Sequence, residues 1–141
     1  DAMESRGLGD VYKRQDLGTA TTFDVVSKNK EYLGGSIAPG IKISLDALTL
    51  KTASLKSVEL DTPNKVIGKN TYEAIQSGLI MGHASMIDSM VEKIILEIDI
   101  EPKIILTGGL SKVVQPILNV NVEYIENLTL VGLEEIFKLN N

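Results

Sequence analysis

The sequence predicts a single α/β domain with a mixed β-sheet flanked by helices. Three observations support this fold class. The chain has 141 residues, which suits one domain with its own hydrophobic core. Strand-forming residues dominate the stretch 19–38, and helical and strand patterns alternate from about residue 71 onwards. The apolar run Ile104–Leu106 leads directly into two glycines and a helical pattern, as a buried strand of such a sheet does.

Composition excludes several kinds of chemistry. There are no cysteines, which rules out a disulfide framework, a Cys-ligated zinc site and a thiol nucleophile. Because His83 is the single histidine, we do not expect a His-based metal cluster. The net charge of -5 argues against a nucleic-acid partner, and the apolar runs are too short for a membrane span or a signal peptide. We therefore expect a cytoplasmic domain with no nucleic-acid or membrane partner.

The first fifteen residues lack the regular spacing of apolar residues that the rest of the chain shows. Gly7 and Gly9 interrupt any helix, and a periodic pattern begins only at Asp16. A frayed terminus and a foreign leader explain this segment equally well. We expect residues 1–15 to be a disordered or foreign leader, and residues 16–141 to form the domain.

An antiparallel ribbon is expected first. Thr19–Val26 has the composition of a strand, residues 28–30 are a polar turn, and Glu31–Ala38 should return as a second strand. Pro39–Gly40 then opens a helix, because proline is tolerated in a first helical turn. The apolar residues of that helix that fall on roughly one face are Ile41, Leu45, Leu48 and Leu55.

The strongest helical pattern spans Thr71–Ile98, after a loop over residues 56–69. Asn70 or Thr71 is the expected N-cap. Gly78 and Gly82 lie on one face, and each costs about 1 kcal/mol relative to alanine in a helix interior. We expect close packing of another backbone there, with the approach of a ligand as the alternative.

The remaining elements follow Pro102. Lys103–Thr107 is expected to form the buried strand, and a helix should run from about Leu110 to Leu118. Val120–Ile125 is expected to be a further strand, and Leu128–Leu139 a closing helix.

Two glycine-containing segments could bind phosphate groups. In the first, Gly18 lets backbone N–H groups approach an anion, Thr19 can donate its hydroxyl, and the Asp16 carboxylate can hold a cation. The structural alternative is a Thr-rich hairpin with an Asx-type turn. The second is Thr107–Gly109, where a ligand could meet the end of a strand and the start of a helix. An ordinary strand–turn–helix junction would use the same glycines.

Two further residues have a structural reading beside a functional one. Thr71 could bind a ligand or cap the long helix. His83 lies in the middle of that helix, where a packed or exposed structural histidine is expected rather than a catalytic base.

Taken in this order, the segments resemble the type III pantothenate kinase family. The matching stretches cover residues 16 to about 139 and read DLGTATTFDVV, GGSIAPGI, TASL, VIGKNTYEAIQSG, ILTGGL and LVGLEEI. That family belongs to the superfamily of acetate and sugar kinases, Hsp70 and actin. The resemblance therefore implies that residues 16–141 form the carboxy-terminal, ribonuclease-H-like lobe of an actin-like ATPase fold.

The resemblance also implies an activity, cofactors and site residues. The activity is ATP-dependent phosphorylation of pantothenate to 4′-phosphopantothenate in coenzyme A biosynthesis, by a cytoplasmic homodimer. The implied cofactors are ATP with Mg²⁺ and a monovalent cation, K⁺ or NH₄⁺. Matched residue by residue, the implied roles are a monovalent-cation ligand for Asp16, ATP binding for Gly18, Thr19, Thr107, Gly108 and Gly109, and pantothenate binding for Thr71.

Two motifs of the family are absent from the sequence. They are the Asp-x-Gly-Asn-Thr phosphate loop and Gly-x-Asp-Arg, whose Asp is the catalytic base, and both should precede Asp16. Asp24 is a candidate replacement for this base, and its proximity is the only observation that supports it. We therefore expect an incomplete lobe that has no catalytic residue and is inactive alone. The alternatives are a non-catalytic regulatory accessory protein of the Bvg accessory factor type and a free-standing dimerisation lobe.

Overall fold

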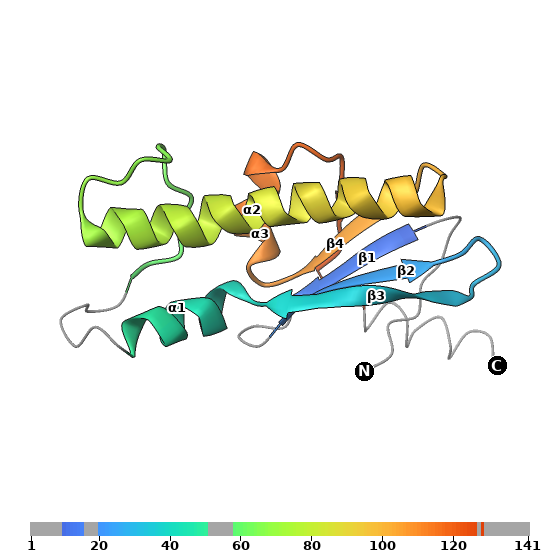
Figure 1. Cartoon of the computed structure of the whole chain (residues 1–141), viewed down its shortest axis with the longest axis horizontal. Coiled ribbons are helices and arrows are strands. Elements are labelled where there is room, and N and C mark those ends of the chain that lie inside the picture. Colours follow the sequence, from blue (N-terminus) through green and yellow to red (C-terminus); the bar gives the residue numbers. More distant parts are fainter. Residues whose placement is uncertain (1–9, 16–19, 51–57, 127, 129–141) are drawn as a thin grey trace.

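The computed structural model describes the chain except for residues 1–9, 16–19, 51–57, 127 and 129–141 (Figure 1). Its elements in chain order are β1 (Asp10–Gln15), β2 (Ala20–Val26), β3 (Tyr32–Pro39), α1 (Ile41–Thr49), α2 (Thr71–Ile98), β4 (Ile104–Gly108), α3 (Ser111–Val114), the 3₁₀ turn η1 (Gln115–Ile117) and β5 (Glu123–Tyr124).

The strands form one mixed sheet with the order β3-β2-β1-β4-β5. β1 and β3 each pair antiparallel with β2, whereas β4 is parallel to both β1 and β5. α2 lies across one face of this sheet, and α1 continues from the end of β3 beneath the N-terminal half of α2 (Figure 1). The predicted α/β class with a mixed sheet is confirmed.

The β2–β3 hairpin forms where the sequence predicts it. Its turn is closed by Ser27, whose hydroxyl oxygen accepts the backbone N–H groups of Asn29 and Glu31, each at 3.2 Å. Lys30 takes the left-handed conformation, with φ of 65°, that lets the chain reverse. The pairing register shifts by one residue between Val25 and Val26, which is a β-bulge.

Helix α2 has the predicted bounds, and its ends have identifiable caps. Asn70 is the N-cap: its side-chain oxygen accepts the N–H of Glu73 at 2.8 Å. At the other end Asp99 is left-handed, with φ of 54°, and its N–H donates to the carbonyl of Ile95. Because Asn70 satisfies the first turn, Thr71 is the first helical residue and not the cap.

Replacing the cap tests this assignment. Asn70→Ala should lower the free energy of unfolding by about 1 kcal/mol, because the first turn loses its side-chain acceptor. Chemical denaturation followed by circular dichroism measures the change. Asn64→Ala, an exposed asparagine of the preceding loop, is the matched control and should be nearly neutral. Equal losses in the two variants would contradict the capping role.

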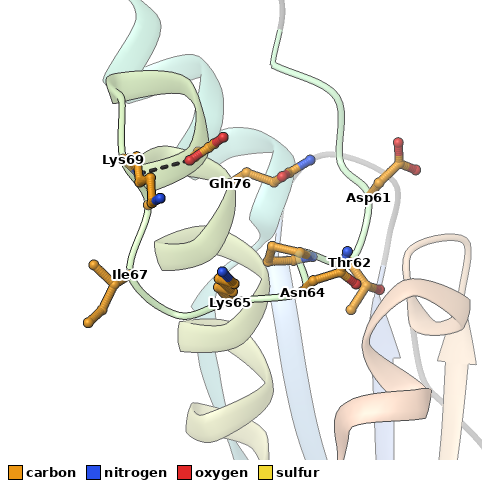
Figure 2. Close-up of a pocket in the computed structure, with 10 residues that line it drawn as sticks. Asp61, Thr62, Asn64, Lys65, Ile67, Lys69 and Gln76 are labelled. Atoms are coloured by element: carbon orange, nitrogen blue, oxygen red, sulfur yellow. Dashed lines mark hydrogen bonds between the residues drawn. The ribbon is translucent and has the colours of Figure 1, made fainter.

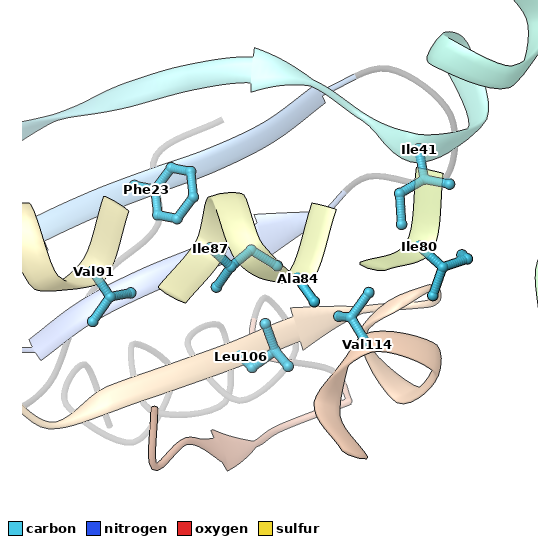
Figure 3. Close-up of a cluster of buried hydrophobic side chains, with 8 residues drawn as sticks. All are labelled: Phe23, Ile41, Ile80, Ala84, Ile87, Val91, Leu106 and Val114. Carbon is cyan, nitrogen blue, oxygen red and sulfur yellow. The ribbon is translucent and has the colours of Figure 1, made fainter. Parts of the chain in front are cut away.

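The main core lies between α2 and the sheet. α2 contributes four residues at helical spacing, and the sheet contributes Phe23 and Leu106 (Figure 3). The complete cluster consists of Phe23, Ile41, Ile80, Ala84, Ile87, Val91, Leu106 and Val114. A smaller cluster of Val26 and Ile105, packed with Ile125 and Leu128, lies apart from it. Alternation along β4 therefore directs Leu106 and Ile105 into different clusters.

Three predicted boundaries are wrong. The sequence predicts no regular element before Asp16, but β1 occupies residues 10–15 at the centre of the sheet, where neighbours on both sides pair with its backbone. The helix predicted over 110–118 is only α3 followed by η1, because Pro116 cannot continue a helical hydrogen-bond ladder. The strand predicted over 120–125 is reduced to β5.

Within the described part of the chain, no backbone packs closely against Gly78 or Gly82. A Cβ built at either glycine would meet nothing within 4 Å, and both positions are exposed. α1 ends at Thr49, before the predicted Leu55. The TASL stretch and the closing helix after Leu128 lie outside the described residues.

Candidate functional site

The glycine turn after β4 lies beside the end of β1. In the parallel ladder Gln15 pairs with Gly108, and in the antiparallel ladder Gln15 pairs with Thr21. Gln15 therefore lies between Gly108 on one side and Thr21 on the other. Asp16, Gly18 and Thr19 themselves lie outside the described residues. The strand ends that flank the two predicted nucleotide segments thus meet at one edge of the sheet, on the side of α1 (Figure 1).

The three residues of the second segment differ in what they present. Thr107 is 5% exposed, and its hydroxyl donates to the carbonyl of Glu126 at 3.4 Å. Its own carbonyl accepts the hydroxyl of Ser111 at 2.6 Å. Gly108 has φ of 105°, a conformation that favours glycine, and Gly109 is exposed. The Thr107 side chain is therefore used internally, and the backbone at the two glycines is what remains for a ligand.

Thr71 is the first residue of α2. It lines a groove between α1 and α2, which we call the interhelix groove, with a volume of about 650 Å³. Leu48 of α1 and Ile75 and Leu79 of α2 are among the other lining residues. Within the described residues the Thr71 hydroxyl has no hydrogen-bond partner, so it is not committed to the fold. The structure does not bring Thr71 together with the glycine turn, because the residues that line this groove do not include Thr107, Gly108 or Gly109.

Four side chains of α2 hold the segment 58–70 against the helix. Tyr72 accepts the N–H of Glu59 at 3.0 Å, and Gln76 donates to the carbonyl of Glu59 at 2.9 Å. The other two contacts are made by the buried Ser77, which donates to the carbonyl of Val66 at 2.5 Å, and by Glu73, which accepts the N–H of Lys69 at 2.8 Å. The segment is therefore fastened along the N-terminal half of α2.

Gly68 is required by this close approach. A Cβ at Gly68 would lie 2.4 Å from the backbone nitrogen of Ala74 and 2.6 Å from the carbonyl carbon of Glu73. These are backbone atoms of a capped helix, which cannot move aside cheaply. The glycine thus lets the loop cross directly over the first turn of α2.

The fastened segment encloses a second hollow, the loop cavity, of about 500 Å³ (Figure 2). Lys65, Lys69, Asn64 and Gln76 are among its lining residues. Lys69 lines both the loop cavity and the interhelix groove, and the sequence alone assigns it no role.

His83 has a structural role, as expected. Its Nε2 lies 2.9 Å from Oγ1 of Thr21, in a buried hydrogen bond that joins α2 to β2. The two residues are 62 positions apart, so no local sequence pattern could reveal the pair.

Asp88 is a buried carboxylate that sequence reasoning missed. It is 7% exposed, and its oxygens accept the N–H groups of Asn119 at 3.0 Å and Val120 at 3.1 Å. The available signal was its position between Ile87 and Val91 on the buried side of α2. The carboxylate anchors the chain after η1 onto the helix.

Asp24, the acid considered as a replacement base, is hydrogen bonded on the surface of the hairpin. It accepts the phenolic hydroxyl of Tyr32 at 3.0 Å. This hydrogen bond, with smaller contributions from desolvation and the carboxylate charge, raises the pKa of Tyr32 above its ordinary value. Among the residues that the structure describes, no three or more His, Cys, Asp or Glu side chains gather in a way that could hold a metal ion. None of the described helices has both the length and the apolar character needed to cross a membrane.

Comparison with known proteins gives consistent results. The family model for type III pantothenate kinases matches residues 15–93. A type III pantothenate kinase of Syntrophus aciditrophicus is 47% identical over 135 residues, which cover 92% of this chain and 53% of that protein. One from Streptomyces griseus is also 47% identical, over 89% of this chain and 48% of its own length. The chain thus spans about half the length of these relatives.

A solved structure shares the fold. It is a conserved Campylobacter jejuni protein, assigned by name to the Baf family of transcriptional activators. The TM-score is 0.66 at 23% identity, over 94% of this chain and 58% of that one.

Proposed function

Because the chain belongs to the type III pantothenate kinase family, we propose that it supplies residues that bind ATP and pantothenate for the ATP-dependent conversion of pantothenate to 4′-phosphopantothenate. The observation that carries the proposal is the pairing of Gln15 with Gly108, which brings the flanks of both nucleotide segments to one sheet edge. The five-stranded mixed sheet under a long helix supports the further assignment to a ribonuclease-H-like lobe.

ATP is proposed to lie against the bare backbone at Gly108 and Gly109, with Thr19 and Gly18 contacting its phosphates. The positive φ of Gly108 and the exposure of Gly109 suit such an approach. Mg²⁺ would arrive with the nucleotide, and Asp16 is the proposed ligand of K⁺ or NH₄⁺, since a carboxylate suits a hard cation. Cation and nucleotide would neutralise the charge that phosphoryl transfer develops.

The family's Gly-x-Asp-Arg motif, which carries its catalytic base, is not in this sequence. Phosphoryl transfer needs a group that orients or deprotonates the attacking hydroxyl. We therefore propose that the chain binds its substrates but does not turn them over alone. A cytoplasmic homodimer is the proposed setting.

Calorimetric titration of the purified chain with ATP·Mg²⁺ and with pantothenate, in K⁺ buffer, tests the proposal. Binding of both without turnover is expected. Turnover by the chain alone at a rate typical of kinases would overturn the proposed inactivity, and failure to bind either compound would overturn the substrate assignments.

Thr71→Val should weaken pantothenate binding about 5-fold, because one neutral hydrogen bond to the ligand is lost. Affinity for ATP should not change, and Thr71→Ser should restore pantothenate binding. Since Asn70 caps the helix, neither variant should lower stability appreciably. An unchanged pantothenate affinity in Thr71→Val would contradict the assigned role.

The alternative is a non-catalytic accessory protein of the Bvg accessory factor type. It is favoured only by the fold shared with the Campylobacter jejuni protein of the Baf family. Absence of both ATP and pantothenate binding in the same titrations would favour it.

A further inference from the structure

Lys69 carries a charge that the described fold does not use. The ion pairs among the described residues join Lys103 to Glu123 and Lys112 to Glu126, and Lys69 takes part in neither. The Lys69 side chain is exposed where the loop cavity and the interhelix groove adjoin.

The position of Lys69 is nevertheless well defined. Its backbone N–H donates to Oε2 of Glu73 at 2.8 Å, a contact drawn as a dashed line in Figure 2. On one side of it Gly68 rests against the backbone of α2, and on the other Asn70 caps the helix. The backbone of Lys69 is therefore fixed in place. Glu73 accepts the backbone N–H of Lys69 with one carboxylate oxygen and makes no ion pair with the Lys69 ammonium group.

The interhelix groove combines this charge with apolar walls. Leu48, Ile75 and Leu79 supply apolar side chains, and Ala74 and Gly78 leave space because they are small. Its volume of about 650 Å³ is in the range of small-molecule sites. A ligand with one negative end and a branched aliphatic body fits these walls.

We infer that Lys69 is a specificity-determining residue that recognises the carboxylate of the substrate in the interhelix groove. The inference rests on the proposed function, since pantothenate carries one carboxylate beside an amide and a branched aliphatic alcohol. Thr71, two residues further along, supplies a neutral hydrogen bond, whereas Lys69 supplies the charge. Charge-assisted hydrogen bonds are roughly twice as strong as neutral ones, so Lys69 separates carboxylate ligands from neutral analogues.

Calorimetry with two ligands and two variants tests this role. The ligands are pantothenate and panthenol, in which a hydroxymethyl group replaces the carboxylate. Lys69→Met should weaken pantothenate binding about 10-fold and leave panthenol binding unchanged. Lys65→Met is the matched control, because Lys65 lines the loop cavity but not the interhelix groove, and it should change neither affinity. Raising the salt concentration should weaken pantothenate binding in the wild-type chain and much less in Lys69→Met.

The possible outcomes separate the inference from the proposed function. If the wild-type chain binds pantothenate and Lys69→Met binds it equally well, the inference is overturned and the proposed function stands. Equal weakening of both ligands would mean that Lys69 only shapes the groove, which also overturns the inference. If the wild-type chain does not bind pantothenate at all, the proposed substrate fails and the inference with it. Circular dichroism of each variant verifies the fold.

Discussion

Phe23→Ala should lower the free energy of unfolding by about 3 to 5 kcal/mol, the largest effect expected of any single substitution considered. Phe23 is 1% exposed and lies on β2 beneath α2, in the cluster with Ile87 and Val91 (Figure 3). Truncation removes buried apolar surface and leaves a cavity that the rigid sheet and the long helix cannot close. Urea denaturation monitored by circular dichroism measures the loss.

Tyr32→Ala is the matched control for Phe23. Tyr32 is an aromatic residue of the neighbouring strand β3, but it is 64% exposed and makes one hydrogen bond on the surface. Its replacement should cost less than about 1 kcal/mol. Should Phe23→Ala fail to fold, Phe23→Leu should still fold at a cost of about 1 kcal/mol. Similar losses for Phe23→Ala and Tyr32→Ala would show that the core does not lie between α2 and β2.

Asp88→Ala should cost about 2 to 3 kcal/mol of folding free energy, because hydrogen bonds to a charged group are lost and their donors are left without acceptors. The carboxylate is buried on α2 and accepts N–H groups of Asn119 and Val120. The segment after η1 is far from α2 in sequence, so this contact contributes to cooperative folding rather than to local helix stability.

Glu92→Ala, one helical turn further along α2, is the control for Asp88 because Glu92 is exposed. It should change stability by no more than about 0.5 kcal/mol. Asp88→Asn keeps one acceptor oxygen without the charge and should fall between the two. If Asp88→Ala is as stable as Glu92→Ala, water replaces the carboxylate and the anchor is not important.

The elements with strong local patterns could be predicted from the sequence. The apolar spacing from Thr71 to Ile98 predicts the bounds of α2, and Pro39–Gly40 predicts the start of α1. The β2–β3 hairpin follows from strand-forming residues on either side of a polar turn. In each case the signal is contained in neighbouring residues, because the period of a helix or strand and the chemistry of a turn are local properties.

Elements determined by distant partners could not be predicted in this way. The residues of β1 show no regular pattern that predicts a strand. β1 is a strand because β2 and β4 pair with it on both sides. The helix expected over residues 110–118 is cut short for a local reason, because Pro116 cannot continue its hydrogen bonds. The buried pairs Thr21–His83 and Asp88–Asn119 join positions far apart in the chain.

The candidate site, like the fold, could be predicted only in part from the sequence. The residue types at Thr71 and Thr107–Gly109, together with the family resemblance, predict from the sequence that these residues bind ligands. The structure shows that Thr71 is not the cap and that the Thr107 hydroxyl is used internally. It also places Lys69, to which the sequence assigns no role, on the interhelix groove.

The sequence by itself determined the α/β class, the long helix, the hairpin and the family resemblance, because periodicity and ordered motifs are written in consecutive residues. Only the tertiary structure decided which strand ends meet at one sheet edge, which hydroxyls remain uncommitted and which lysine lines the interhelix groove. The physical reason is that these properties depend on pairing and packing between residues that are distant in the chain, and hydrogen bonds and burial exist only once those residues are brought together.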